Sequence, residues 1–420
     1  MSDILLQKFF EKQRWEEALE TGVDKHMDKA ELKKLCTPEI RAALYSAIVN
    51  DNYEIAPPHQ AQIPKDNGEM RIVYVNENVD RIFLSIANNL FFEMFPEFIH
   101  PTCKSYQSGI GCGKIVQQVA QSVVSTKTQD VGLKADLTKY FDRVPIRYVD
   151  TIFDRMEEKV GKSKIIDVVR KYYHADLCFD VNGDLIEHYQ SLKQGCAVAS
   201  FLADAVLYDI DKAISKLNVY YVRYSDDLLA LGDDWQSAYE LIKTMLNEMK
   251  LELNPKKVEI LTKDRWFKFL GFNIKGSQIT LSKSRVKTFQ KEIEARTIKQ
   301  RNISTARALN QVNSYLYKGD GKYSWATSVL PIINVQKDID TLNEFVLDAI
   351  RACATGKKKI GGLGSVNDKE DYTILRGTGK NVTSNRTKTE KDIHNYLSIR
   401  CMQNALLTRR AVYDTLVRSM

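Results

Sequence analysis

Two adjacent carboxylates, Asp226 and Asp227, lie between runs of strand-forming apolar residues in the segment "YYVRYSDDLLAL" (220–231). This pattern predicts a β-hairpin whose turn carries the acidic pair. Neighbouring carboxylates on a tight turn repel each other unless a cation compensates their charge. Magnesium, which prefers carboxylate oxygens as ligands, is the cation that we expect at this turn.

A third carboxylate, Asp136, lies at the end of the short apolar segment "VGLKADL" (131–137), which predicts a buried strand. An uncompensated charge there would be costly, so Asp136 is the candidate third ligand. Three carboxylates on neighbouring strands suit a site with two metal ions, one activating an attacking hydroxyl and one stabilising a leaving pyrophosphate. From these residues alone, an ordinary turn together with a helix cap remains the alternative.

A second acidic pair, Asp233 and Asp234, follows Gly232 and precedes a helical segment beginning at Trp235. A carboxylate in this position can accept hydrogen bonds from the free N–H groups of a helix and interacts favourably with its dipole. We therefore interpret this pair as a helix cap and not as a metal site.

Composition limits the class of protein. The 420 residues are 44% hydrophobic, which is enough for a large core. The seven cysteines are odd in number and form no CxxC pair, which favours reduced thiols over a zinc site. No run of about 18 apolar residues predicts a membrane span, and the charged start predicts no signal peptide, so we expect a cytoplasmic protein.

The charge is distributed unevenly along the chain. Residues 280–420 carry 25 Lys and Arg against 13 Asp and Glu, a net charge of +12, whereas residues 1–279 have a net charge of −5. A basic C-terminal third on an acidic body suggests a polyanion bound at one end, although basic helices are also often simply solvated.

Helical and strand-like segments alternate irregularly, with hairpins in the middle of the chain, which predicts an α+β fold. "DNG" (66–68) marks a turn between two strands. The remaining expected elements are helices over 79–95, 199–217, 235–250 and 392–418, strands over 251–261 and 266–281 with a turn at 276–277, and mainly helices over 282–353.

Six motifs in a fixed order resemble those of bacterial reverse transcriptases, the enzymes of group II introns and retrons. The resemblance covers about Gln62 to Leu281. The motifs are "IPKDNGEMRIVYV" (the fingers hairpin), "ADLTKYFDRVP" (the first catalytic Asp), "SLKQGCAVASFLADAVLYDID" (the Gln-Gly motif and its helix), "YSDD" (the YxDD box), "LELNPKKVEIL" (the lysine motif) and "FKFLGFNI" (the primer-grip hairpin).

The resemblance implies that Asp136, Asp226 and Asp227 are the catalytic residues and the ligands of two Mg²⁺ ions. It also implies nucleotide contacts. Phe141 would be the residue that excludes a ribose 2′-hydroxyl, and Lys257 a possible general acid for pyrophosphate. The remaining implied contacts are Lys65 and Arg71 with the triphosphate, and Gln194 and Gly195 with the incoming nucleotide, where "CAVAS" replaces the family's usual Pro-Ser pattern.

The implied fold is a right-hand polymerase: an N-terminal helical segment (1–60), fingers and palm with an antiparallel sheet (61–281), a helical thumb (282–353) and a basic C-terminal extension (354–420). The segment "KKKIGGLGS" is similar to the defence-associated, so-called unknown-group reverse transcriptases. Its lysines, Lys357, Lys358 and Lys359, are the expected RNA-binding residues.

The implied function is RNA-directed DNA polymerisation that makes cDNA from dNTPs, on a dedicated noncoding RNA in bacterial antiphage defence. Three alternatives stay open. They are an RNA-dependent RNA polymerase, which Phe141 and the "YSDD" turn disfavour, an inactive RNA-binding scaffold, and template-independent or protein-primed synthesis from a C-terminal Tyr or Ser. The sequence leaves the template and the oligomeric state undetermined.

Overall fold

The structure of the chain, a computed structural model, divides into two compact units. The first comprises Met1–Ser108 and Lys127–Leu261, and the second comprises Gly109–Thr126 and Thr262–Met420. The residues that the structure describes are 3–21, 27–64, 68–106, 111–187, 191–300, 303–318 and 324–355.

The first unit is built around a four-stranded sheet with the strand order β6-β7-β3-β8. β6 and β7 form an antiparallel hairpin, and β7 also pairs antiparallel with β3. β3 is buried along most of its length, as its apolar sequence predicts, because a central strand is covered on both faces. The bounds are β3 Asp130–Asp136, β6 Tyr220–Tyr224, β7 Asp227–Leu231 and β8 Glu259–Thr262.

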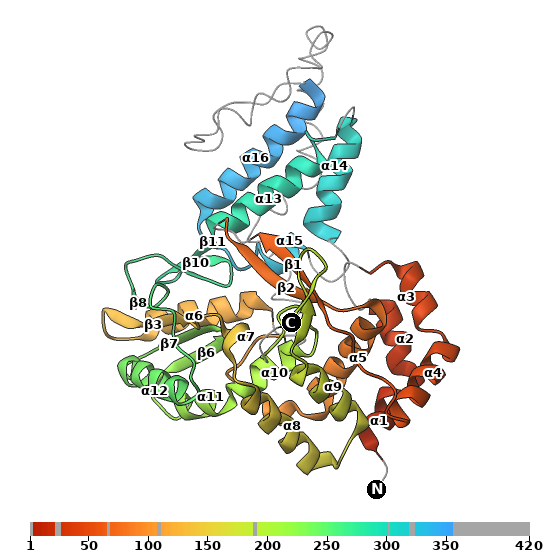
Figure 1. Cartoon of the computed structure of the whole chain (residues 1–420). Helices are drawn as coiled ribbons and strands as arrows, with labels where there is room; N and C mark the ends of the chain where they lie inside the picture. Colours follow the sequence, from red (N-terminus) through yellow and green to blue (C-terminus); the bar gives the residue numbers. More distant parts are fainter. Residues whose placement is uncertain are drawn as a thin grey trace. The chain divides into compact units, whose positions relative to one another are not determined.

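Helices supply the rest of the first unit's core. α12 packs against β3, and α5 packs against α1, α2 and α10 (Figure 1). Several of these helices begin where the sequence offers a cap: the Ser163 hydroxyl accepts the Ile165 N–H at the start of α9. The bounds are α1 Ile4–Phe9, α2 Lys12–Thr21, α3 Lys29–Leu35, α4 Pro38–Val49, α5 Asn78–Met94, the 3₁₀ turn Pro96–Phe98, α7 Tyr140–Arg143, α8 Ile146–Val160, α9 Lys164–His174, α10 Ala199–Val206, α11 Tyr208–Ile214 and α12 Trp235–Glu248.

A second sheet of the first unit contains the predicted hairpin, in the strand order β2-β1-β4-β5. Its β2 strand lies directly against Gly195: the Tyr74 N–H donates to the Gln194 carbonyl at 2.7 Å. Gly195 has φ +108°, and a Cβ there would lie 2.7 Å from the backbone carbonyl oxygen of Tyr74. A side chain at position 195 would therefore push the strand away. The bounds are β1 His59–Pro64, β2 Met70–Val75, β4 Leu177–Phe179 and β5 Leu185–Glu187.

The second unit combines a small sheet with a helical bundle. β9, β10 and β11 form an antiparallel meander, and α6 contacts β10 and β11. α13, α14 and α16 pack against one another and lie side by side in Figure 1. The bounds are α6 Cys112–Ser125, β9 Phe267–Phe269, β10 Phe272–Lys275, β11 Gln278–Leu281, α13 Lys283–Arg296, α14 Thr305–Asn313, the π turn Ser314–Lys318, α15 Trp325–Ser328 and α16 Gln336–Thr355.

The α+β class is confirmed, and three predicted elements need correction. The helix expected over 199–217 is two helices, which separate at Leu207. The strand expected over 251–261 is limited to β8, because Leu253 makes only an isolated bridge to Leu137. The segment 266–281 contains three strands, since a further turn occurs at Leu270 and Gly271, both with positive φ. The expected helix over 392–418 lies outside the described residues.

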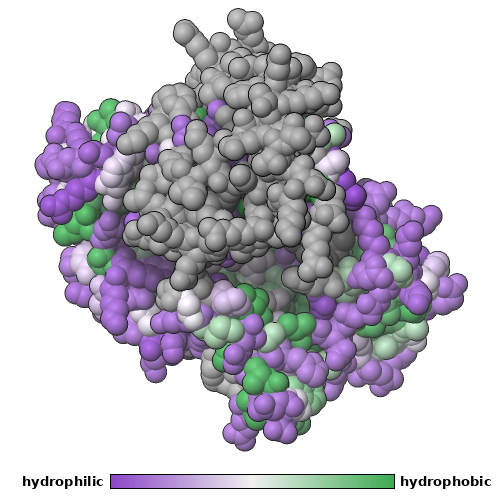
Figure 2. All heavy atoms as spheres, turned by 90° about the horizontal axis from the view of Figure 1, so that it is seen from above, coloured by the Kyte–Doolittle hydropathy of each residue, from purple (hydrophilic) through white to green (hydrophobic). Residues whose placement is uncertain are grey.

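The exposed surface is mixed. The coloured part of the face in Figure 2 is mainly hydrophilic, with smaller apolar patches between the polar regions. Among the described residues, no helix is both long enough and apolar enough to cross a membrane.

The contact between Gly195 and β2 generates a prediction for stability. Gly195→Ala should lower the free energy of unfolding by about 2–4 kcal/mol, because it combines an unfavourable positive φ with a steric overlap on Tyr74. Gly183→Ala is the matched control, since Gly183 has φ +91° with nothing within 4 Å of the added Cβ, and it should cost only about 1 kcal/mol. Urea denaturation measures both variants. Equal losses would show that the overlap at Tyr74 is relieved without cost.

Candidate active site

The three predicted catalytic carboxylates converge at one edge of the central sheet. Asp136, the last residue of β3, is the direct register partner of Asp227, the first residue of β7. Asp226 lies in the turn that joins β6 to β7, and its carbonyl accepts the Leu137 N–H. The sheet register therefore brings Asp136 and Asp227, which are 91 positions apart in the chain, into one site, as the sequence pattern predicts.

Burial and like charge dominate the electrostatics of this edge. Asp136 is only 7% exposed. The pKa of Asp226 is raised from 3.8 to about 6, first by burial and then by the neighbouring charges of Asp136 and Asp227, with Lys257 opposing the shift. These carboxylates are thus held together against their mutual repulsion.

A cationic side chain contacts this cluster. The Lys257 ammonium lies 2.7 Å from Oδ2 of Asp136, and its side chain is otherwise more than half exposed. The ion pair holds Lys257 at the site where the family resemblance predicts it, and it partly compensates the carboxylates.

The donor chemistry fits magnesium, a hard cation that prefers carboxylate oxygens as ligands. Its positive charge would offset the repulsion among the three carboxylates. As the side chains stand, however, no three Asp, Glu, His or Cys residues within the described ranges are close enough together to enclose a metal ion. A metal site at Asp136, Asp226 and Asp227 is therefore a proposal that involves side-chain adjustment.

The second acidic pair does precede a helix, and one detail of its predicted role is wrong. Asp234 is the N-cap residue of α12, but its side chain makes no capping hydrogen bond. It accepts the backbone N–H of Asn218 instead, at 3.1 Å. Asp233 is exposed. Neither residue belongs to the carboxylate cluster around Asp136, and the choice of Asp226 and Asp227 as the catalytic pair stays a prediction.

The structure describes some of the residues that are predicted to contact the nucleotide. Arg71 is exposed on β2, where its guanidinium is available to phosphate oxygens. Phe141 is partly buried and packs against the core, so its role as a steric gate stays a prediction. Gln194 and Gly195 lie against Tyr74 of β2. Lys65, Lys357, Lys358 and Lys359 lie outside the described residues.

A cavity of about 850 Å³ adjoins the turn that carries Asp226 and Asp227 within the first unit. Tyr106 belongs to its wall, and the Tyr106 hydroxyl contacts Oγ of Ser225 at 3.4 Å, next to Asp226. Amide, hydroxyl, aromatic, cationic and carboxylate groups share the wall, which suits a ligand with both rings and polar edges. The lining residues are Asn88, Asn89, Phe92, Glu93, Pro96, Ile99, Pro101, Lys104, Tyr106 and Ser200.

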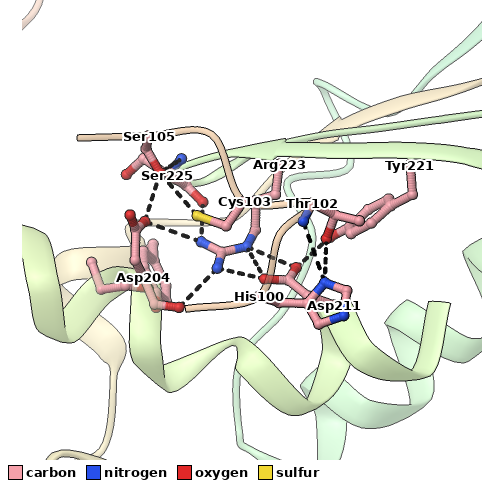
Figure 3. A network of polar contacts seen from close by, with 11 residues as sticks. His100, Thr102, Cys103, Ser105, Asp204, Asp211, Tyr221, Arg223 and Ser225 are labelled. Atoms are coloured by element: carbon pink, nitrogen blue, oxygen red, sulfur yellow. Dashed lines mark hydrogen bonds and ion pairs between the residues drawn. The ribbon is translucent and has the colours of Figure 1, made fainter. Parts of the chain in front are cut away.

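The sequence reading missed a buried polar network below the turn, centred on Arg223 (Figure 3). Arg223 has no exposed surface and lies between Asp204 and Asp211. Two signals could have found it. Arg223 is a charge within the apolar strand "YYVRY", and the two aspartates are seven positions apart in the apolar segment "FLADAVLYDID".

A second buried charge was also missed. Lys193 precedes Gln194, is fully buried, and donates to the Tyr172 carbonyl at 2.8 Å and to the Ala175 carbonyl at 3.3 Å. Burial lowers its pKa to about 8. Its ammonium group therefore satisfies carbonyl groups at the C-terminal end of α9 and fixes the start of the Gln-Gly segment.

The raised pKa of Asp226 generates a prediction for stability against pH. The folded form binds a proton more tightly than the unfolded form, so the charged carboxylate destabilises the fold increasingly as pH rises from about 4 to about 6. Above that range, Asp226→Asn should stabilise the metal-free protein by on the order of 2–3 kcal/mol, since about two units of pKa shift are removed. At pH 4 the two proteins should differ little.

Thermal unfolding in a chelator, at pH 4 and at pH 8, provides the measurement. Asp233→Asn, at the exposed position of the second acidic pair, is the control that removes the same charge outside the cluster. A variant at position 226 that is no more stable than the wild type at pH 8 would contradict the electrostatic account.

A comparison with protein families identifies the family of this chain. The sequence model of the family "Reverse transcriptase (RNA-dependent DNA polymerase)" matches residues 63–274. No curated protein matches the chain. A solved structure of apo telomerase from Candida tropicalis, truncated from its C-terminal domain, is 14% identical with a TM-score of 0.40; the match covers 62% of this chain and 63% of that chain.

That structural match is too remote to support an argument, so the assignment depends on the family model and on the site. The family model spans half of the chain and contains Asp136, Asp226, Asp227 and Lys257. The chain belongs to the reverse transcriptase family, the RNA-directed DNA polymerases, which are nucleotidyltransferases.

Proposed function

We propose that this protein makes cDNA by nucleotidyl transfer at Asp136, Asp226 and Asp227. The observation that supports the proposal most directly is the convergence of these carboxylates at one sheet edge, where the pKa of Asp226 is raised by burial and by its acidic neighbours. Such a cluster is unfavourable without a cation and is therefore suited to binding one. When bound, two Mg²⁺ ions would activate the primer hydroxyl and stabilise the leaving pyrophosphate.

The side chains around the cluster have complementary roles in this proposal. Arg71, exposed on β2, would bind phosphate oxygens of the incoming dNTP through its planar guanidinium. Gly195, where a Cβ would meet Tyr74, allows the hairpin backbone to lie close to the Gln-Gly segment. Nζ of Lys257 lies 2.7 Å from Oδ2 of Asp136, and we propose that Lys257 donates a proton to the leaving pyrophosphate.

The cavity beside the turn is the proposed position of a template nucleotide. The Tyr106 ring can stack on a base, and the amides of Asn88 and Asn89 can hydrogen-bond with its edge. Lys104 in the same wall provides a cation for the backbone phosphate.

The finer part of the proposal concerns the template and the biological role. The resemblance of "KKKIGGLGS" to defence-associated bacterial reverse transcriptases favours a dedicated noncoding RNA copied in antiphage defence. The net charge of +12 on residues 280–420 supports RNA binding by the C-terminal third, including Lys357, Lys358 and Lys359.

The test of the function is metal-dependent incorporation of dTTP by the full chain on a poly(rA) template with an oligo(dT) primer, alongside sequencing of the nucleic acid that copurifies. Asp136→Ala and Asp226→Ala should each reduce incorporation by about three orders of magnitude or more, since each removes a proposed metal ligand. Asp233→Ala, in the other acidic pair, should retain wild-type activity.

Two outcomes would contradict the proposal. Incorporation that survives Asp226→Ala would show that the turn is not catalytic. A wild-type protein that incorporates nothing, on either the supplied or the copurified RNA, would favour an RNA-binding scaffold instead.

Substrate choice provides a separate prediction. Phe141→Ala should raise incorporation of rNTP relative to dNTP by about tenfold or more, because removal of the ring opens space at the 2′ position. Competition between the two nucleotide types on one template measures the ratio. If the ratio does not move while stability falls, Phe141 is a packing residue, as its partial burial against the core also allows.

A further inference from the structure

Arg223 lies two residues before the catalytic turn and is completely buried. Its Nε donates to both carboxylate oxygens of Asp211, at 2.9 and 3.0 Å, and its Nη2 donates to Asp211 at 2.7 Å. On the other side, Nη2 donates to the Asp204 carbonyl at 2.8 Å, and Nη1 lies 3.4 Å from the Asp204 carboxylate (Figure 3). The planar guanidinium is thus fixed in position and orientation by two aspartates.

This network extends to the backbone of the catalytic turn. Nη1 of Arg223 donates to the Ser225 carbonyl at 3.1 Å. The Ser225 N–H donates to Oγ of Ser105 at 2.9 Å, and the Ser105 hydroxyl in turn donates to Asp204 at 2.6 Å. Both backbone polar groups of Ser225 are therefore bound by members of one network (Figure 3).

The conformation held in this way is unusual. Ser225 has φ +57°, in the left-handed region that a side chain with Cβ disfavours. The next two residues are Asp226 and Asp227, so relaxation of Ser225 to an ordinary conformation would redirect both carboxylates. The loop that carries Ser105 is anchored as well: the Arg223 N–H donates to the Thr102 carbonyl, and the Lys104 N–H donates to the Arg223 carbonyl.

Stability alone does not explain a network of this kind. Buried ion pairs contribute little compared with apolar side chains of similar volume, because desolvation offsets their attraction. Their value lies in orientation, since every donor direction of Arg223 is used and two of the bonds in the network end on Ser225.

We propose that Arg223, Ser105 and Asp204 form a positioning network that holds Ser225 in its left-handed conformation and thereby sets the metal affinity and turnover of the catalytic carboxylates. This inference rests on the proposed polymerase function. In this proposal, none of the three residues contacts the substrate, and each acts through the backbone of the turn.

Ser105→Ala is the most informative variant, because it removes the acceptor of the Ser225 N–H and changes no charge. Ser163→Ala is the matched control. Ser163 is also a buried serine whose hydroxyl accepts a backbone N–H, from Ile165 at the start of α9, and it lies outside the network. Both variants lose one buried acceptor, so similar decreases in melting temperature are expected.

Three measurements separate positioning from stability. The kcat of dTTP incorporation on poly(rA) with oligo(dT) should fall at least tenfold for Ser105→Ala, with the KM for dTTP changed less than twofold. Binding of Mn²⁺ to the protein without nucleic acid, followed by electron paramagnetic resonance, should weaken at least fivefold. Ser163→Ala should match the wild type in both.

Arg223→Lys provides a second variant. It keeps a buried positive charge between Asp204 and Asp211 but lacks the fork that reaches Ser225 at the same time. Loss of kcat and of Mn²⁺ affinity in a folded protein is expected. If Arg223→Lys fails to fold, the comparison of the two serine variants decides.

The outcomes distinguish this inference from the function on which it rests. An inactive wild type contradicts the proposed polymerase function. An active wild type with Ser105→Ala equal to Ser163→Ala in kcat and in Mn²⁺ affinity overturns the positioning network while the polymerase stands.

Discussion

Mutual repulsion among Asp136, Asp226 and Asp227 is the physical interaction that the first unit has to accommodate. The three carboxylates are brought together by the register of β3 with β7, and burial makes the charge of Asp226 still more costly. The interactions that oppose this cost come from distant parts of the chain. Lys257 approaches Asp136 from the segment before β8, and Ser105 binds the backbone N–H of Ser225 in the turn.

A site of this kind is held by the surrounding structure and not by its own local preferences. Ser225 adopts a backbone conformation that its own type disfavours by about 1–2 kcal/mol. Hydrogen bonds to residues 2 and 120 positions away in the chain maintain it. Backbone strain that tertiary contacts enforce is common where a protein must present reactive groups in one arrangement.

The parts of this fold that the sequence predicts are those determined by local pattern. Runs of strand-forming apolar residues on both sides of Asp226 and Asp227 indicate the hairpin, and the apolar segment 131–137 indicates the buried strand that carries Asp136; both are confirmed. The break at Leu207 is not visible in the sequence, because the segment 199–217 keeps a continuous helical pattern through it. It is apparent only from the two separate helices, which carry Asp204 and Asp211 to Arg223. Long-range polar pairing of this kind gives only a weak signal in the sequence, namely a charged residue among apolar neighbours.

The hydrogen bond from the Tyr74 N–H to the Gln194 carbonyl also determines which changes in chain length the hairpin can accept. Successive strand residues face opposite sides of a sheet, so a shift of one residue would turn Arg71 to the other face. Tyr74 is anchored at one end of β2 and Arg71 lies near the other, three residues away. Insertions at the tip, between Pro64 and Met70, do not change the number of residues between Arg71 and Tyr74. A single deletion between these two residues would move Arg71 to the opposite face of the sheet. Natural variation in loop length among related chains should therefore be confined to the tip.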